Sequence, residues 1–112
     1  MKVSRIEDMK DGWFIGDFEP SILRTSNFEV GYKFHKKGED WPAHYHKGSE
    51  YNFLQSGKMR ICGRIVTAGD LFVIEPLEVA DPEFLEDCHV IVVKVPSKPG
   101  DKFIVEKEEK NV

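Results

Sequence analysis

Residues 38–57 read GEDWPAHYHKGSEYNFLQSG and carry two histidines and a glutamate at close spacing. His44 and His46 are separated by one residue, so on a β-strand both imidazoles point to the same face. Glu50 can begin the next strand after a turn at residues 47–49, and a hairpin would bring its carboxylate back beside the two rings. Two imidazoles and one carboxylate are the ligands of a 2-His-1-carboxylate metal site. The alternative interpretation is two half-exposed surface histidines, which are common in proteins.

Glycines bracket this stretch and make the pattern specific. The outer glycines would form the turns around two adjacent strands, and the fixed positions are Gly38, His44, His46, Glu50 and Gly57. This spacing resembles the first motif of the cupin superfamily without a gap or substitution, and the resemblance covers residues 28–95. It implies a small single-domain cupin, which is an all-β, double-stranded β-helix (jelly roll). It also implies that the cavity of this fold holds a metal ion bound by His44, His46 and Glu50.

The second cupin motif matches less closely. Its glycine and proline correspond to Gly69 and Pro76, which are separated by six residues where the family has five. Glu78 stands where the family has its second glycine, and Asp81 stands where it has a histidine ligand. The resemblance therefore makes Asp81 the candidate fourth ligand, since aspartate oxygens bind divalent metal ions. The alternative is that Asp81 only forms a turn with Pro82.

Two other histidines are less suited to the site. His89 shares the strand at residues 88–95 with Lys94 and lies on the opposite face from it. If Lys94 faces solvent, His89 faces inward and becomes the rival fourth ligand. Its place after the usual ligand position instead favours a hydrogen-bonded histidine or one at the cavity rim. His35 is followed by two lysines and is expected to be solvated.

The rest of the chain reads as short strands separated by turns. Glycine or proline recurs about every ten residues, and no segment has apolar residues at helical spacing over three turns. Strands are expected at residues 28–34, 41–46, 50–55, 59–66 (a hairpin around Cys62 and Gly63), 71–74 (buried) and 88–95. If Glu50 faces inward, Asn52 and Leu54 do too. Met59 and Ile61 share a face, but the pattern leaves open which face is the inner one.

Length and composition exclude several classes of protein. One domain over residues 1–112 is expected at this length. The formal charge of −4 argues against nucleic-acid binding. The longest apolar run, residues 90–93, is far shorter than the ~20 residues that cross a bilayer, and residues 1–8 lack the apolar region of a signal peptide. The chain has two cysteines, which are expected to be reduced thiols in a cytoplasmic protein.

Both ends of the chain carry further expectations. Trp13, Phe14 and Phe18 form an aromatic cluster within residues 1–27. Small cupins often pack N-terminal strands on a partner, so the resemblance implies a homodimer through this cluster. The alternative is a core contact within one chain. Residues 101–112 are expected to form a charged tail.

The resemblance implies a site for one divalent transition metal ion, which would be Fe, Mn, Ni, Co or Zn. We expect a metal-dependent enzyme of the isomerase, dioxygenase or lyase type, with a small oxygen-rich substrate such as a carbohydrate derivative or a keto acid. A fold alone does not determine the reaction. Two alternatives therefore stay open: a non-catalytic small-ligand-binding or regulatory cupin, and a degenerate cupin whose site is structural.

Overall fold

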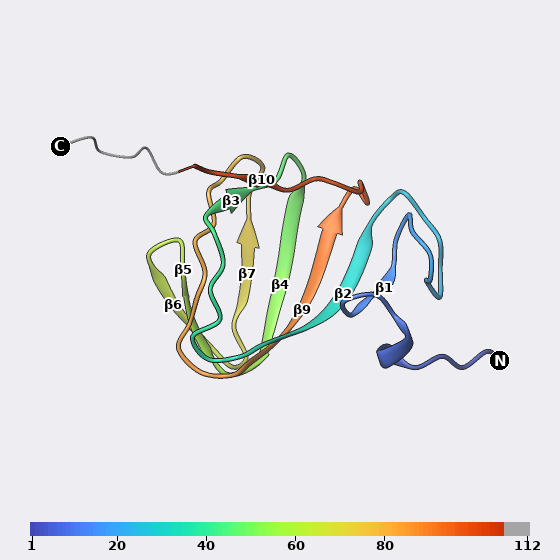
Figure 1. Ribbon diagram of the computed structural model, residues 1–112, viewed down its shortest axis with the longest axis horizontal. Helices are drawn as coiled ribbons and strands as arrows, with labels where there is room; N and C mark the ends of the chain where they lie inside the picture. The colour runs from blue at the N-terminus through green and yellow to red at the C-terminus, as the bar shows by residue number, and fades with distance from the viewer. Residues whose placement is uncertain (107–112) are drawn as a thin grey trace.

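The computed structural model describes residues 1–106, which form short β-strands and one 3-10 helix, η1 (Ile6–Asp8) (Figure 1). The strands are β1 (Trp13–Ile15), β2 (Glu29–His35), β3 (His44–Tyr45), β4 (Ser49–Ser56), β5 (Lys58–Ile61), β6 (Arg64–Thr67), β7 (Leu71–Ile74), β8 (Glu83–Phe84), β9 (Cys88–Val95) and β10 (Phe103–Ile104). Among residues 1–106, no helix has the length and apolar content needed to cross a membrane.

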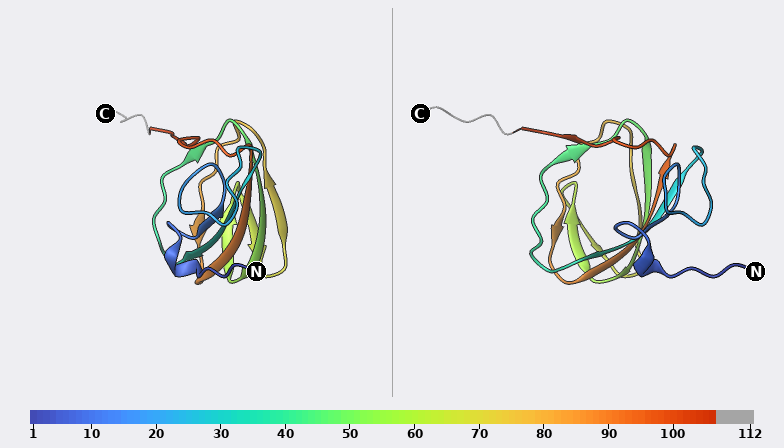
Figure 2. Two further views of the ribbon diagram at one scale, coloured as in Figure 1. Left: turned by 90° about the vertical axis from the view of Figure 1, so that its right-hand side faces the viewer. Right: turned by 45° about the vertical axis from the view of Figure 1, so that its right-hand side comes forward.

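The strands form one large sheet and two smaller ones. The large sheet has the order β1-β2-β9-β4-β7, and the smaller ones have the orders β6-β5-β8 and β10-β3. The pairings between these strands are all antiparallel. The large sheet faces the smaller ones across the interior (Figure 2). The predicted all-β fold class is therefore confirmed.

The predicted strands are present, but three short ones were not foreseen. β2, β4, β7, β9 and the β5–β6 hairpin fall where the periodicity placed them. β1, β8 and β10 are only two or three residues long, which is too short for an alternating pattern. The expectation that residues 71–74 are buried is wrong in part, because Leu71 is 79% exposed and Val73 is 47% exposed.

The apolar core lies between the sheets. Alternation in β4 sends Asn52 and Leu54 to the inner face with Glu50, as predicted. Met59 and Ile61 of β5 also face inward, which settles the choice that the sequence left open. The buried core consists of Leu54, Met59, Ile61, Ile74, Ala80, Phe84, Cys88, Val90 and Val92.

Trp13 is a partly buried residue of the cavity wall. Its ring covers Gly31 of β2, where an added Cβ would lie 2.7 Å from the ring atom Cε3. Trp13 packs against the core and lines the cavity. The core contact within one chain, which was the alternative for this cluster, is thus present at Trp13, whereas Phe14 lies near Ile6 and Ile22 around a second hollow.

The segment after residue 100 is structured where it is described. Phe103 and Ile104 form β10 and pair with Tyr45 and His44 of β3. Two residues of the segment expected to form a charged tail are therefore part of a strand. The remainder of that predicted tail, residues 107–112, lies outside the described residues.

Gly57 and Gly63 provide a matched test of the packing at the end of β4. Both have positive φ, +98° and +72°, but only at Gly57 would a Cβ collide with another segment, 2.2 Å from the Asp87 carbonyl oxygen. We expect Gly63→Ala to lower the free energy of unfolding by about 1–2 kcal/mol, the cost of the left-handed backbone alone. Gly57→Ala should cost about 3 kcal/mol or more because it adds a steric clash.

Denaturant unfolding of both variants measures this difference. Equal losses in the two variants would contradict the close approach of residues 57 and 87.

Candidate functional site

A cavity of about 200 Å³ lies between the sheets. Its wall combines apolar side chains with histidines, lysines and one carboxylate. The lining residues are Trp13, Lys33, His35, Trp41, His44, His46, Glu50, Asn52, Met59, Ile61, Phe72, Ile74, Ala80, Pro82, Phe84, Val90, Val92, Lys94 and Lys102. The three strongest sequence candidates, His44, His46 and Glu50, are all in this set.

His44 is oriented by its own backbone. It lies in β3 and is 8% exposed, and its Nδ1 lies 3.0 Å from the carbonyl oxygen of Pro42. A carbonyl oxygen only accepts, so Nδ1 carries the proton and donates it. The Nε2 lone pair of the neutral ring is then free to bind a cation or accept a hydrogen bond.

His46 is buried without a hydrogen-bond partner. It is 4% exposed, and its Nδ1 makes no hydrogen bond within residues 1–106, although Oε2 of Glu50 lies 3.4 Å away. Burial, with the positive charge of Lys94 acting in the same direction, lowers the pKa of His46 to about 4. The imidazole is therefore neutral at pH 7, which is the form that binds metals.

Asp101 shapes the turn that joins His46 to Glu50. Its carboxylate accepts hydrogen bonds from the backbone N–H groups of Lys47, at 2.8 Å, and Gly48, at 3.0 Å. These two bonds hold the turn that returns the chain from β3 into β4. No sequence pattern predicts this contact, because Asp101 lies more than 50 residues further along the chain.

The nitrogen and oxygen ligands that His44, His46 and Glu50 offer suit a borderline divalent ion, but these side chains do not converge on one point. The rings of His44 and His46 meet edge to face with centroids 5.2 Å apart. Within residues 1–106, no three His, Cys, Asp or Glu side chains are grouped closely enough to hold an ion. The unpaired Nδ1 of His46 and the oriented ring of His44 fit a metal, and binding one would require these side chains to shift.

The two candidates for a fourth ligand differ in position. Asp81 is exposed and does not line the cavity, although its neighbour Ala80 pairs with His44 through the backbone. Its role as a ligand stays a prediction. His89 faces away from the cavity because Lys94, on the other face of β9, points inward. The His89 ring stacks on Tyr32, and its Nδ1 lies 2.8 Å from the Ser56 hydroxyl oxygen in a hydrogen bond.

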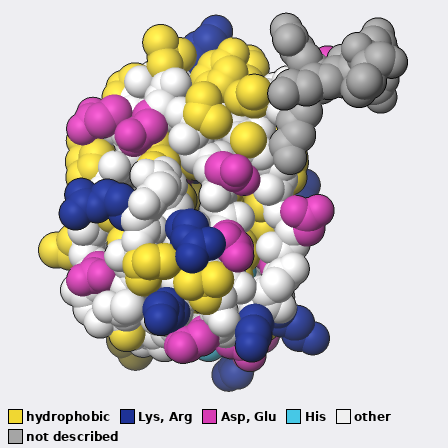
Figure 3. Space-filling model, turned by 90° about the vertical axis from the view of Figure 1, so that its left-hand side faces the viewer, with side chains coloured by type: hydrophobic (Ala, Val, Ile, Leu, Met, Phe, Trp, Pro, Cys, Tyr) yellow, Lys and Arg dark blue, Asp and Glu magenta, His cyan; other side chains and the backbone are white. Residues whose placement is uncertain are grey.

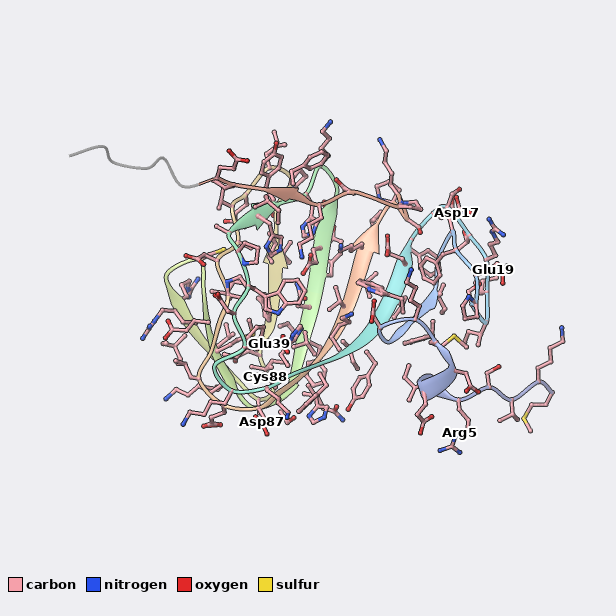
Figure 4. All side chains as sticks on the ribbon, in the orientation of Figure 1. Arg5, Asp17, Glu19, Glu39, Asp87 and Cys88 are labelled. Carbon is pink, nitrogen blue, oxygen red and sulfur yellow. The ribbon has the colours of Figure 1, made fainter. Side chains whose placement is uncertain are left out.

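The expectation that His35 is solvated is wrong. Its side chain is 13% exposed, stacks on Phe84 with centroids 4.3 Å apart, and lines the cavity. One carboxylate oxygen of Glu39, labelled in Figure 4, lies 2.5 Å from His35 Nδ1 and accepts a hydrogen bond from Trp41 Nε1. The four-residue spacing from His35 to Glu39 could have indicated this contact. The two lysines that follow His35 favoured a solvated position instead.

Three lysines in the cavity wall were not foreseen as site residues. Lys33 and Lys94 place their ammonium groups 5.2 Å and 5.3 Å from the ring centre of Trp13, and Lys102 lies 3.9 Å from that of Trp41. Burial lowers the pKa of Lys33 and of Lys102. Lys33 and Lys94 were missed because alternation within a strand separates two faces but does not show which of them is the inner one.

Comparison with known proteins gives the fold. No protein-family model and no curated protein matches the chain. Among solved structures, an uncharacterised protein with a double-stranded β-helix domain from Klebsiella pneumoniae subsp. pneumoniae MGH 78578 superposes with a TM-score of 0.68 at 19% identity, covering 95% of this chain and 93% of that chain.

Two further structures connect the fold to named proteins. The DMSP lyase DddQ from Ruegeria pomeroyi DSS-3 matches with a TM-score of 0.69 at 15% identity, covering 84% of this chain and 50% of that chain. An RmlC-like cupin from Shewanella frigidimarina NCIMB 400 matches with a TM-score of 0.61 at 19% identity, covering 67% and 71%. This chain therefore spans about half the length of the DddQ chain.

Proposed function

Because the chain has the cupin fold, a double-stranded β-helix, we propose that its cavity is the active site of a metal-dependent enzyme. His44, His46 and Glu50 would hold one divalent transition metal ion, Fe, Mn, Ni, Co or Zn. The substrate would be a small oxygen-rich molecule, such as a carbohydrate derivative or a keto acid. The observation that carries the proposal is the buried, neutral and unpaired imidazole of His46 beside Glu50 in this cavity.

The chemistry of the cavity is consistent with this role. A bound metal ion would polarise a substrate oxygen or lower the pKa of a bound water. The Pro42 carbonyl keeps His44 in one tautomer, and Asp101 holds the turn that places Glu50 near His46. The apolar wall limits the water around these groups. The lyase activity in the name of DddQ supports an enzyme on this fold, but at 15% identity it does not identify the reaction.

A second candidate function is a non-catalytic cupin that binds a small ligand or carries only a structural site. The ungrouped arrangement of the donor side chains favours it, since a formed metal site is not present in the described residues. Metal content separates an occupied site from a degenerate one. Oxygen uptake, or conversion of carbohydrate derivatives and keto acids, separates an enzyme from a binder.

The metal site is tested by His44→Ala and His46→Ala. Each variant should lose stoichiometric metal while the fold is retained, because each removes one of the three donors. Elemental analysis of protein purified without added metal measures this, with circular dichroism as the check on folding. His89→Ala is the matched control, because its ring lies on the outer face of the large sheet. Wild-type metal content in the double variant would rule out the site.

The fourth ligand is a separate proposal. We expect Asp81→Ala to weaken metal affinity about 10–100-fold, a loss comparable to that of a supporting group. Asp81→His, which restores the usual cupin residue, should retain the metal. Competition titration with a chelator measures both affinities. An unchanged affinity in Asp81→Ala would mean that the segment at Asp81 and Pro82 is only a turn.

A homodimer is also proposed, and the outer face of the large sheet is the surface that supports it. Tyr51 lies opposite Val73 of β7 and Val93 of β9, and Phe53 lies opposite Leu71. Tyr51 and Val73 are each 47% exposed and Leu71 is 79% exposed. An apolar surface of this kind usually marks an interface, and β7 at the edge of the sheet offers unpaired backbone groups.

Light scattering tests the dimer. We expect a particle of about twice the 12.9 kDa chain mass, and one chain mass for Leu71→Glu combined with Val73→Glu. Ile65→Glu, at a site of similar exposure on β6, should leave the mass unchanged. A wild-type particle of one chain mass at micromolar concentration would overturn the dimer.

A further inference from the structure

The charge of the cavity wall is opposite to that of the chain. The chain has a formal charge of −4, yet the wall contains three lysines and only one carboxylate, that of Glu50. The face of the molecule seen in Figure 3, on the side of the β5–β6 hairpin, mixes acidic and basic side chains with apolar ones. Lysines are rarely placed in an enclosed space without a partner. The cavity therefore provides a localised positive site in an acidic protein.

Aromatic rings hold these lysines, and their ammonium groups are not used up by acidic side chains. Lys33 and Lys94 both place their ammonium groups over the indole of Trp13, and this ring lies against Gly31, where a Cβ would collide with it. Within residues 1–106, none of the three lysines forms an ion pair with an acidic side chain, although Lys94 lies between Glu29 and Glu50 in the sheet register. Lys33 Nζ donates one hydrogen bond to the Asp11 carbonyl oxygen, and each ammonium has three donors. Several donors therefore remain for a ligand.

Asn52 supplies a second, independent observation. It is 6% exposed and lines the cavity, and its Nδ2 is buried without a hydrogen-bond partner in the described residues. In the register of the large sheet, Asn52 lies next to Val92, two residues from Lys94 on the same inner face. An unsatisfied buried amide N–H requires an acceptor. The unpaired donor of Asn52 and the positive charges of the lysines therefore both favour the same kind of ligand, an anion whose oxygens can accept hydrogen bonds.

The volume of the cavity and its apolar lining restrict the kinds of ligand that would fit. About 200 Å³ is below the ~300–1,000 Å³ typical of sites for drug-sized ligands, so the ligand is small. Phe72, Ile74 and Val92 provide apolar surface around Asn52 and Glu50. A small anion with an apolar skeleton satisfies both parts of the wall, whereas a fully hydrophilic anion such as phosphate satisfies only the charged part.

We propose that this cavity binds a small monocarboxylate, with Lys33, Lys94, Lys102 and the amide of Asn52 holding its carboxylate and the apolar wall holding its carbon skeleton. The proposal rests on the proposed function only in using the same cavity, and it selects acids over neutral carbohydrate derivatives as substrates. The lysines are positioning residues for the ligand and do not depend on a bound metal.

The test uses butyrate, with butyramide as a neutral molecule of the same shape. Trp13 and Trp41 are the only tryptophans of the chain and both line the cavity, so their indole N–H resonances report binding at this site. Titrations followed by NMR are made on the full chain, both metal-free and after metal loading. We expect butyrate to shift these resonances in both states, with an affinity at least 10-fold above that of butyramide.

Variants assign the binding to the named side chains. Lys94→Met, Lys33→Met and Asn52→Asp should each weaken butyrate binding at least 10-fold, and Lys94→Arg should retain it. Lys98→Met is the control for loss of one positive charge, since Lys98 is exposed and does not line the cavity. If an inner variant fails to fold, Lys102→Met gives the same test from the less buried 101–104 segment, where a milder effect on folding is expected.

Each outcome is decisive. Butyramide binding as tightly as butyrate, or the lysine variants binding butyrate like the wild type, would overturn the carboxylate site. Inorganic phosphate shifting the same resonances with higher affinity than butyrate would replace it with a phosphate site. Butyrate binding to a protein that never retains a metal would leave the carboxylate site standing and remove the proposed metal-dependent function. Metal retention without butyrate binding would leave the proposed metal site standing and overturn the carboxylate site.

Discussion

The position of β9 between β2 and β4 decides which side chains enter the cavity. Its antiparallel register places Lys94 between Glu29 and Glu50, and Val92 between Gly31 and Asn52. Because side chains alternate along each strand, this register assigns one whole row of residues to the interior and the next to the outer face. A shift of β9 by one residue would send Val92 and Lys94 outward and bring His89 and Val93 inward.

That register also explains what the sequence could predict and what it could not. The spacing of His44, His46 and Glu50 identified three residues that do line one cavity, and the alternation in β4 placed Asn52 and Leu54 with Glu50. For β9 the sequence left the inner face conditional on Lys94 and favoured a hydrogen-bonded His89, and His89 does share a hydrogen bond with Ser56. Lys94 points inward, because an aromatic ring holds its ammonium, and His89 therefore points outward.

Contacts between distant parts of the chain were beyond the sequence for a different reason. Asp101 accepts hydrogen bonds from the turn between His46 and Glu50, and β10 pairs with β3. Neither contact leaves a local pattern, since one is a single acidic side chain and the other a pair of residues in a stretch rich in charge. The sequence also left open whether Trp13 contacts a second chain or its own core, and in the structure it covers Gly31 and forms part of the cavity wall.

The surroundings of two histidines in the cavity wall, His35 and His46, differ. One carboxylate oxygen of Glu39 lies 2.5 Å from His35 Nδ1, and this hydrogen bond orients the ring. Burial disfavours the charged form of His46, and the nearby ammonium groups of Lys94 and Lys102 oppose protonation further. Cations that would attract an anionic ligand therefore also keep the imidazole of His46 neutral, with its lone pair free. The ring of His46 is thus neutral chiefly because it is buried, with the lysines acting in the same direction, whereas His35 is held by Glu39 on another part of the wall.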